Sequence, residues 1–346
     1  MRINHSLWIV PGIAATYIGT VVGAGFASGR EVYQFFTLYG GRGTLGVILA
    51  TLLLGTVGTK IFMLGVKLKP KSYRDLLELL LGKTFAPIAD LILFLFFTTL
   101  IGVMLAGCGS IFETVGFGYW PGVVISGLFT VLTLFKGLNG IISVNLIVVP
   151  LMLVGSIGIS IYAIPNRCVG PIAIGNGLNW MLAAFQYSAY NLILALPVLL
   201  SLAQRYPFPR SLKLGSWGGS LGLGLMSGFI HWSILSHLPH LQHSALPMVE
   251  LAKLMGTWAF WGYIMVLWGE MITTLLANTY GVAQRLMVLT GWPFRWWALI
   301  SVVVGSFIAQ LGFVNLIARF YPLYGFLSLI LLFFIVCRKT PKQRSL

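Results

Sequence analysis

The chain contains ten apolar stretches, most of them near the length of about 20 residues that an α-helix needs to cross a bilayer, whereas the first is too long for a single straight crossing. Backbone groups in the hydrocarbon core must be paired within the protein, which restricts spanning segments to α-helices and closed β-barrels. The apolar runs do not alternate with polar residues, so they predict an all-α integral membrane protein. Their approximate bounds are 7–39, 44–66, 85–112, 119–135, 138–164, 178–203, 214–235, 258–287, 296–311 and 316–336.

Charge and hydropathy exclude a soluble protein and indicate its orientation. Mean hydropathy is +0.92, and charged residues make up only 8% of the chain. The net charge of +15 does not indicate nucleic-acid binding, because Lys and Arg fall mainly in short connections, as the positive-inside rule describes. Basic residues follow the second stretch and end the chain. Residues 1–346 are therefore predicted to form one transmembrane domain with cytoplasmic termini and the lipid bilayer as partner, with the oligomeric state left open.

The first apolar stretch contains the segment Gly19–Glu31, with the sequence GTVVGAGFASGRE. Three glycines lie close together in it: Gly23, Gly25 and Gly29. Such a run favours an interrupted helix, which leaves free carbonyls and free N–H groups at one place, as in transporters. The alternative is that the glycines let neighbouring helices pack closely. Arg30 and Glu31 favour the interruption, because charges at this depth must face protein or water.

A second interruption is predicted in the sixth stretch, where polar residues follow one another closely. They are Gln186, Tyr187, Ser188, Tyr190 and Asn191. Interrupted helices at positions one and six of ten define two halves, about 7–164 and 178–337. Since five is odd, the second half must enter from the opposite side, which predicts an inverted repeat with a substrate site at mid-membrane.

The segment TYIGTVVGAGFASGRE, from Thr16 to Glu31, resembles the YkvI-like bacterial membrane proteins of the amino acid, polyamine and organocation (APC) transporter superfamily. The number of spans and the basic connections extend the resemblance over nearly the whole chain, although only this motif is specific. The resemblance implies the ten-helix inverted-repeat fold of the bacterial leucine transporter (LeuT), with helices 1 and 6 discontinuous. It also implies a cation-coupled secondary transporter in the bacterial inner membrane. It does not supply the substrate.

In that fold a sodium ion is commonly held by carbonyls of helix 1 and hydroxyls of helix 8. The resemblance carries these positions to the carbonyls of Gly19 and Val22 and the hydroxyls of Thr273 and Thr274. Hard oxygen ligands suit such a cation. The alternative is that both threonines bond back to their own helix. Proton-driven relatives place a lysine in helix 5, and its absence here beyond Lys136 favours sodium; no other cofactor is expected.

Glu270 lies roughly 12 residues into the eighth stretch and therefore near mid-membrane. It is a candidate proton carrier or cation ligand, and the alternative is an ion pair with Arg30. In LeuT-type proteins an arginine of helix 1 and an acid of helix 10 form the outer gate. The tenth stretch here offers Arg319, so the hypothesis is a reversed pair of Glu31 and Arg319, acting as a gate or as a static bridge.

The expected substrate is a small zwitterion such as an amino acid. Backbone N–H groups of residues 24–27 are expected to face its carboxylate, and Tyr187 or Ser188 its amine. The absence of an unmatched acid certain to lie in the pocket argues against a polyamine. The candidate substrate residues are Gly23, Ala24, Gly25, Phe26, Ala27, Met104, Phe185, Tyr187, Ser188 and Tyr190.

Other polar residues are given structural interpretations. Asp90 is expected to pair with the basic inner connection, and His231 to be a hydrogen-bonded interior residue. An enzyme is disfavoured because the chain has no HExxH motif and no paired Asp motif. The alternatives to transport are a channel and a non-transporting nutrient sensor that uses the same fold.

Overall fold

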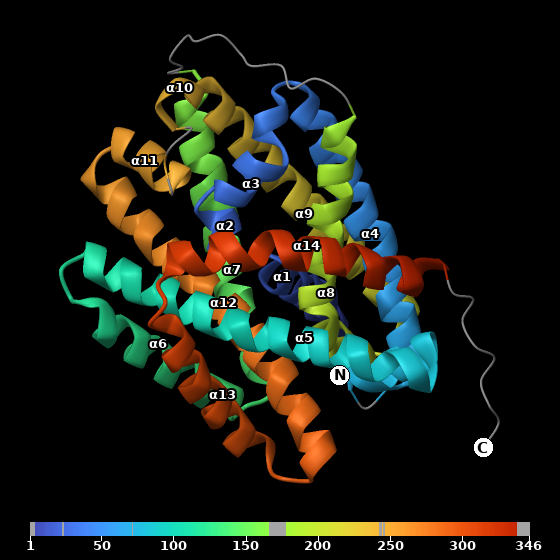
Figure 1. The fold of residues 1–346 in the computed structure, drawn as a ribbon. Helices are drawn as coiled ribbons and strands as arrows, with labels where there is room; N and C mark the ends of the chain where they lie inside the picture. The colour runs from blue at the N-terminus through green and yellow to red at the C-terminus, as the bar shows by residue number, and fades with distance from the viewer. Residues whose placement is uncertain are drawn as a thin grey trace.

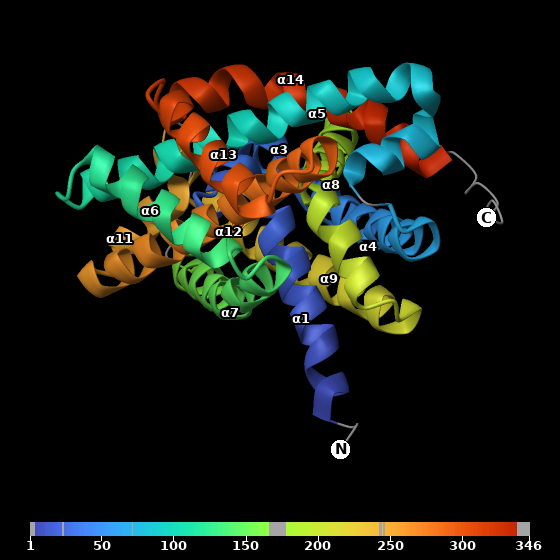
Figure 2. The same ribbon diagram turned by 90° about the horizontal axis from the view of Figure 1, so that it is seen from below.

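The computed structural model describes residues 4–22, 24–70, 72–165, 178–241, 244 and 246–337. It forms a bundle of packed helices, with no strand among these residues (Figure 1). Helices α5 and α14 lie side by side along one side of the bundle, as Figures 1 and 2 both show. The chain is a multi-pass membrane protein, as its apolar stretches predict.

Every predicted apolar stretch corresponds to a helix whose ends lie within a few residues of the expected bounds, except where the first stretch is interrupted and where the third helix begins earlier. Helices α4, α5, α7, α8 and α12 are each long and apolar enough to cross a membrane. The matching helices are α1 (Asn4–Val21), α4 (Arg42–Leu68), α5 (Tyr73–Thr114), α6 (Tyr119–Leu134), α7 (Leu138–Ala163), α8 (Asn179–Arg205), α9 (Pro209–Ser236), α12 (Thr257–Thr290), α13 (Phe294–Ala309) and α14 (Phe313–Cys337).

The first stretch is interrupted, as predicted. After α1 ends at Val21, the chain forms the single turn α2 (Ala24–Ala27), then α3 (Arg30–Phe35) and the 3₁₀ turn η1 (Thr37–Tyr39). Gly29, between α2 and α3, has φ 80°, a left-handed conformation that glycine adopts at little cost. Gly23, which precedes α2 in the sequence, lies outside the described residues.

The predicted interruption of the sixth stretch is wrong, because α8 is one continuous helix from Asn179 to Arg205. The segment contains no glycine, and two of its polar side chains hydrogen-bond to their own helix. The Ser188 hydroxyl donates to the carbonyl of Ala184, and the Asn191 amide donates to the carbonyl of Tyr187. A run of polar residues therefore does not by itself break a helix when each side chain can reach a carbonyl one turn earlier.

Glycines in α5 allow close helix packing. A Cβ atom at Gly107 would lie 2.7 Å from Sδ of Met271, and one at Gly109 would lie 2.7 Å from the ring of Tyr119. Distances this short would force the neighbour to move, so these positions have no room for a larger residue. The small residues of α5 thus serve the packing of α6 and α12 against it.

The connection between α9 and α12 contains two helices that the sequence did not indicate, α10 (Leu238–Leu241) and α11 (Pro247–Leu254). This connection packs against the interrupted segment. The Met248 N–H donates to the carbonyl of Ser28 at 3.0 Å, and Arg30 donates to the carbonyl of Ser244 at 3.2 Å. These bonds pair backbone groups close to Gly29 and stabilise the entrance to α3.

Candidate functional site

Helix α12 holds the interrupted segment at both of its ends. The Thr274 hydroxyl donates to the carbonyl of Val22 at 2.7 Å, and the Tyr263 hydroxyl donates to the carbonyl of Ala27. Thr274 follows Tyr263 by 11 residues, which is about three helical turns, so both side chains lie on one face of α12. This face therefore satisfies carbonyls that the interruption of the first helix leaves without a regular helical partner.

Glu270 lies on the same face of α12, between these two hydrogen bonds. It follows Tyr263 by seven residues and precedes Thr274 by four, spacings that place all three side chains on one face of α12. Helix α12 contacts α2. Its side chain is fully buried, and neither carboxylate oxygen has a hydrogen-bond partner among the described residues. A buried acid without a partner is costly, which makes Glu270 a functional candidate.

The alternative of an ion pair between Glu270 and Arg30 is wrong. The Arg30 guanidinium lies 4.8 Å from the centre of the Tyr33 ring and donates to the Ser244 carbonyl. No described cation forms an ion pair with Glu270. The Arg30 side chain thus belongs to the contact between α3 and the α9–α12 connection.

Glu31 is the second buried acid at the interruption, with only 3% of its surface exposed. Its carboxylate folds back against Gly25, where a Cβ atom would overlap it. Neither of its oxygens has a hydrogen-bond partner among the described residues. The carboxylates of Glu31 and Glu270 lie close enough for their charges to interact. The side chain of Arg319 lies outside the described residues, so the reversed gate with Glu31 stays a prediction.

Tyr187 of α8 faces both acids. Its side chain is buried, and its hydroxyl has no hydrogen-bond partner among the described residues, although Ser227 lies beside it. The charges of Glu31 and Glu270 both act on this hydroxyl. The Tyr187 ring also contacts Phe36, with ring centres 5.0 Å apart. The structure thus brings together an acid of α3, an acid of α12 and a tyrosine of α8.

The other predicted substrate residues have different surroundings. Phe26 of α2 and Met104 of α5 are fully buried, whereas Tyr190 packs its ring 5.7 Å from that of Phe96. Ser188 is occupied by the carbonyl of its own helix, and Phe185 is 38% exposed, so it does not join the buried cluster. The backbone of Ala27 lies beside Glu270. Gly23 and the side chain of Ala24 lie outside the described part of the chain.

The four predicted cation ligands are only partly brought together. Thr274 contacts the Val22 carbonyl, whereas Thr273 donates to the Glu270 carbonyl of its own helix, which is the alternative that the sequence left open. The amide of Asn145 in α7 packs directly against Gly19. Both polar atoms of Asn145 are buried without a hydrogen-bond partner in the described structure. The side-chain oxygen of Asn145 thus joins the Val22 carbonyl and the Thr274 hydroxyl as a candidate cation ligand near the end of α1.

No protein-family model matches this chain. It is 29% identical over 340 residues to a Bacillus subtilis protein named uncharacterized membrane protein YkvI, covering 96% of this chain and 97% of that protein. It is 28% identical over 318 residues to the B. subtilis uncharacterized protein YyaD, covering 91% and 92% of the two chains. These relatives confirm the resemblance to YkvI-like membrane proteins.

Solved structures show the fold. MhsT in complex with L-phenylalanine has a TM-score of 0.66 at 16% identity, covering 92% of this chain and 87% of that chain. A Na⁺-coupled sialic acid symporter has a TM-score of 0.64 at 13% identity, covering 94% and 79%. This chain has the LeuT-type fold. These similar structures are membrane transporters rather than enzymes, as the sequence led us to expect.

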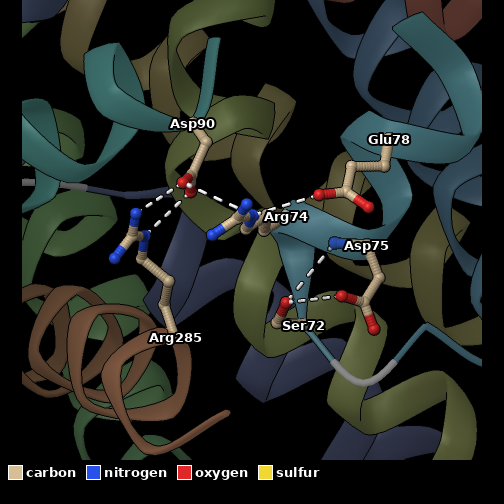
Figure 3. A network of polar contacts seen from close by, with 6 residues as sticks. All are labelled: Ser72, Arg74, Asp75, Glu78, Asp90 and Arg285. Atoms are coloured by element: carbon tan, nitrogen blue, oxygen red, sulfur yellow. Dashed lines mark hydrogen bonds and ion pairs between the residues drawn. The ribbon is translucent and has the colours of Figure 1, made fainter. Parts of the chain in front are cut away.

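The LeuT-type bundle is braced elsewhere by an ion-pair network around Asp90 (Figure 3). The Arg285 guanidinium of α12 donates to both carboxylate oxygens of Asp90 in α5, with Nε at 2.8 Å from Oδ1. Arg74, which belongs to the predicted basic connection and lies in the first turn of α5, is 3.8 Å from the same carboxylate and 3.2 Å from Glu78. The prediction that Asp90 pairs with the basic connection is confirmed, and Arg285 is the partner that the sequence did not indicate.

The sequence interpretation missed two of the residues that the LeuT-type fold places at the interruption. Tyr263 could have been found from its spacing to Glu270 and Thr274, because all three fall on one helical face. Asn145 is a single polar residue of the fifth stretch, and no motif around it marks it as a site residue. The interior position of His231 was predicted and is confirmed, since its ring nitrogens lie 3.1 Å and 3.3 Å from the hydroxyls of Thr37 and Thr44.

Proposed function

We propose that this protein is a secondary active transporter that moves a small solute across the bacterial cell membrane by alternating access. The observation that carries the proposal is the interruption of the first helix between Val21 and Ala24. Beside it lie the buried acids Glu31 and Glu270, whose carboxylates have no hydrogen-bond partner among the described residues. Irregular backbone at membrane depth is tolerated where it lines a site, and the LeuT-type fold uses such a site for its solute. Cytoplasmic termini and inverted halves, about 7–164 and 178–337, belong to the same proposal.

The proposed substrate is an amino acid or a related amine. Tyr187, Glu31 and Glu270 supply groups that attract the amine, and the backbone N–H groups of residues 24–27 are proposed to face the carboxylate of an amino acid. The two unmatched acids remove the sequence argument against a polyamine, because that argument rested on the absence of such acids.

The proposed coupling ion is Na⁺ or H⁺. For Na⁺ the donors would be the carbonyls of Gly19 and Val22 with the hydroxyl of Thr274, a set of hard oxygen ligands. For H⁺ the carrier would be Glu270, whose buried carboxylate has no described hydrogen-bond partner. Coupling to Na⁺ predicts that a Thr274 variant changes the cation dependence of uptake, whereas coupling to H⁺ predicts that a Glu270 variant does.

The test is accumulation of labelled solutes in proteoliposomes that contain the purified protein. We expect uptake against a concentration gradient when an inward gradient of Na⁺ or H⁺ is imposed, and no accumulation without a gradient. Liposomes without protein, and liposomes treated with an ionophore that collapses the gradient, are the controls. A ligand that raises thermal stability without any flux under either gradient would contradict transport and favour the sensor.

A further inference from the structure

We infer that Glu31 and Glu270 together form a binding site for an organic amine that carries a net positive charge. This inference deepens the proposed function by naming the class of solute, and it depends on that function only in treating the amine as the transported molecule.

The two carboxylates approach the interrupted helix from different elements. Glu31 reaches back from α3 onto Gly25, in the middle of α2. Glu270 projects from the face of α12 that is bonded to Val22 through Thr274 and to Ala27 through Tyr263. Both acids therefore border the single turn α2, and they lie close enough for their charges to interact.

Other buried or paired acids in the described structure have basic partners, whereas this pair has none. Asp90 is bonded to Arg285, Glu78 lies 3.2 Å from Arg74, and Glu250 lies 3.1 Å from Lys253. The four carboxylate oxygens of Glu31 and Glu270 have neither a hydrogen-bond partner nor an ion-pair partner among the described residues. Two adjacent buried acids repel each other when both are charged, so a cation between them would lower the free energy of the ligand-bound state.

A third group independently indicates a ligand at this place. The hydroxyl of Tyr187 is buried, has no described hydrogen-bond partner and is acted on by the charges of both acids. A hydroxyl in such a position can accept a hydrogen bond from an ammonium group. A single ammonium ligand would give a partner to all three of these groups at once.

The surroundings favour an amine over a metal ion. Phe26 is fully buried in α2, and the rings of Phe35 and Phe36 lie 5.7 Å and 5.0 Å from that of Tyr187. Aromatic faces attract ammonium groups and accommodate their methylene chains, whereas Ca²⁺ takes six to eight oxygen ligands. The described residues contain no cluster of three or more metal-ligating His, Cys, Asp or Glu side chains. A net positive solute such as a diamine or arginine fits better than a zwitterion, because it carries one cationic group for each of the two acids, whereas a zwitterion carries only one.

The first test is ligand-dependent thermal unfolding of the purified full chain at constant ionic strength. The probes are 1,4-diaminobutane, arginine, leucine, glutamate, NaCl and MnCl₂. We expect diaminobutane and arginine to raise the unfolding temperature of the wild type, and their affinity to fall about tenfold or more in E31Q and in E270Q. E250Q, which changes a surface acid, should respond as the wild type does. Y187F should weaken amine binding less than either Gln variant, and it provides a test if a Gln variant cannot be purified.

Three results would overturn the inference. One is stabilisation by leucine or glutamate that equals that by the amines. Another is a shift with MnCl₂ or NaCl alone that the Gln variants abolish, while the amines have no effect. The third is an unchanged amine affinity in both Gln variants and in Y187F.

Flux measurements separate this inference from the proposed function. Accumulation of labelled leucine in proteoliposomes, without accumulation of labelled arginine or diaminobutane, would refute the amine site and leave transport intact. Amine binding that E31Q and E270Q abolish, without flux of any probe under a Na⁺ or H⁺ gradient, would refute transport and leave the site intact. Gradient-driven uptake of an amine that is lost in both variants would support the two together.

Discussion

The hydroxyl of Thr274 donates a hydrogen bond of 2.7 Å to the carbonyl of Val22, which lies 252 residues earlier in the chain. This bond joins the end of α1 to the middle of α12. The neighbouring Thr273 instead donates to the carbonyl of Glu270, within its own helix. Two adjacent threonines thus form a matched pair, in which only one contacts the interrupted segment.

We expect Thr274→Ala to destabilise the protein and to weaken cation-dependent uptake. Loss of the hydroxyl leaves the buried Val22 carbonyl without this donor, at a cost of about 1–3 kcal/mol. If Na⁺ is the coupling ion, losing one of its oxygen ligands should raise the sodium concentration for half-maximal uptake about tenfold. Thermal unfolding and a sodium titration of uptake measure the two effects.

Thr273→Ala is the control for this prediction, because it removes only a bond within α12. It should change stability and sodium dependence much less than Thr274→Ala, and Thr274→Ser should retain most of both. An equal loss of sodium dependence in both alanine variants would show that the bond to Val22 is not what matters. An unchanged sodium dependence in Thr274→Ala would remove this residue from the cation site.

The second prediction concerns the ion pair that braces α5 against α12. Replacement of Asp90 by Asn should destabilise the protein by on the order of 3 kcal/mol, because the partly buried Arg285 loses its charged partner. Replacement of Glu250 by Gln, in an exposed pair with Lys253, should cost less than about 1 kcal/mol. Thermal unfolding in one detergent compares the two variants. Similar shifts in both would show that burial does not strengthen the Asp90 pair.

The third prediction separates glycines that are needed for packing from those that are not. A Cβ atom at Gly122 of α6 would lie 2.7 Å from the carbonyl oxygen of Cys108, so Gly122→Ala should cost about 1–3 kcal/mol. A Cβ atom at Gly158 of α7 would meet no atom within 4 Å, so Gly158→Ala should stabilise the helix by about 0.5–1 kcal/mol. Opposite shifts in unfolding temperature are expected. A loss of stability in both variants would contradict the packing explanation.

The sequence predicts the helices and the first interruption well because both depend on local signals. Long apolar runs set the spans, and the glycines around Gly25 allow the chain to leave the helix. The same local argument failed at α8, where Ser188 and Asn191 bond to carbonyls of their own helix. Polar residues indicate an interruption only when the backbone also has a residue, such as glycine, that tolerates one.

The candidate site was only partly predictable, because its parts are distant in the sequence. Glu270 was identified from its depth in an apolar stretch, and Glu31 from its place in the first motif. Their convergence on α2 depends on how α3 folds back and how α12 packs, and no local pattern encodes that. For the same reason an ion pair with Arg30 stayed open as the alternative for Glu270, although the Arg30 side chain contacts Tyr33 and Ser244 instead.

The last prediction concerns the charge state of Glu270. Its buried carboxylate has no described partner and is faced by Glu31, Tyr187 and Tyr263, so ionising it without a bound cation is unfavourable. In the ligand-free wild type this carboxyl group must either hold its charge without a described partner or stay protonated, and both cost free energy relative to an exposed carboxylate. Glu270→Gln, which keeps the shape of the side chain and cannot ionise, should therefore exceed the ligand-free wild type in stability by about 1–3 kcal/mol.

The matched measurement is thermal unfolding of ligand-free wild type, E270Q and E250Q, followed by uptake under an imposed pH gradient. E250Q should follow the wild type, because Glu250 is exposed and paired with Lys253. If Glu270 carries the coupling proton, E270Q should also lose the response of uptake to that gradient. If it instead binds the amine, E270Q should weaken solute affinity and leave this response unchanged. A ligand-free E270Q that is less stable than the wild type would mean that a group close to Glu270 stabilises its charge.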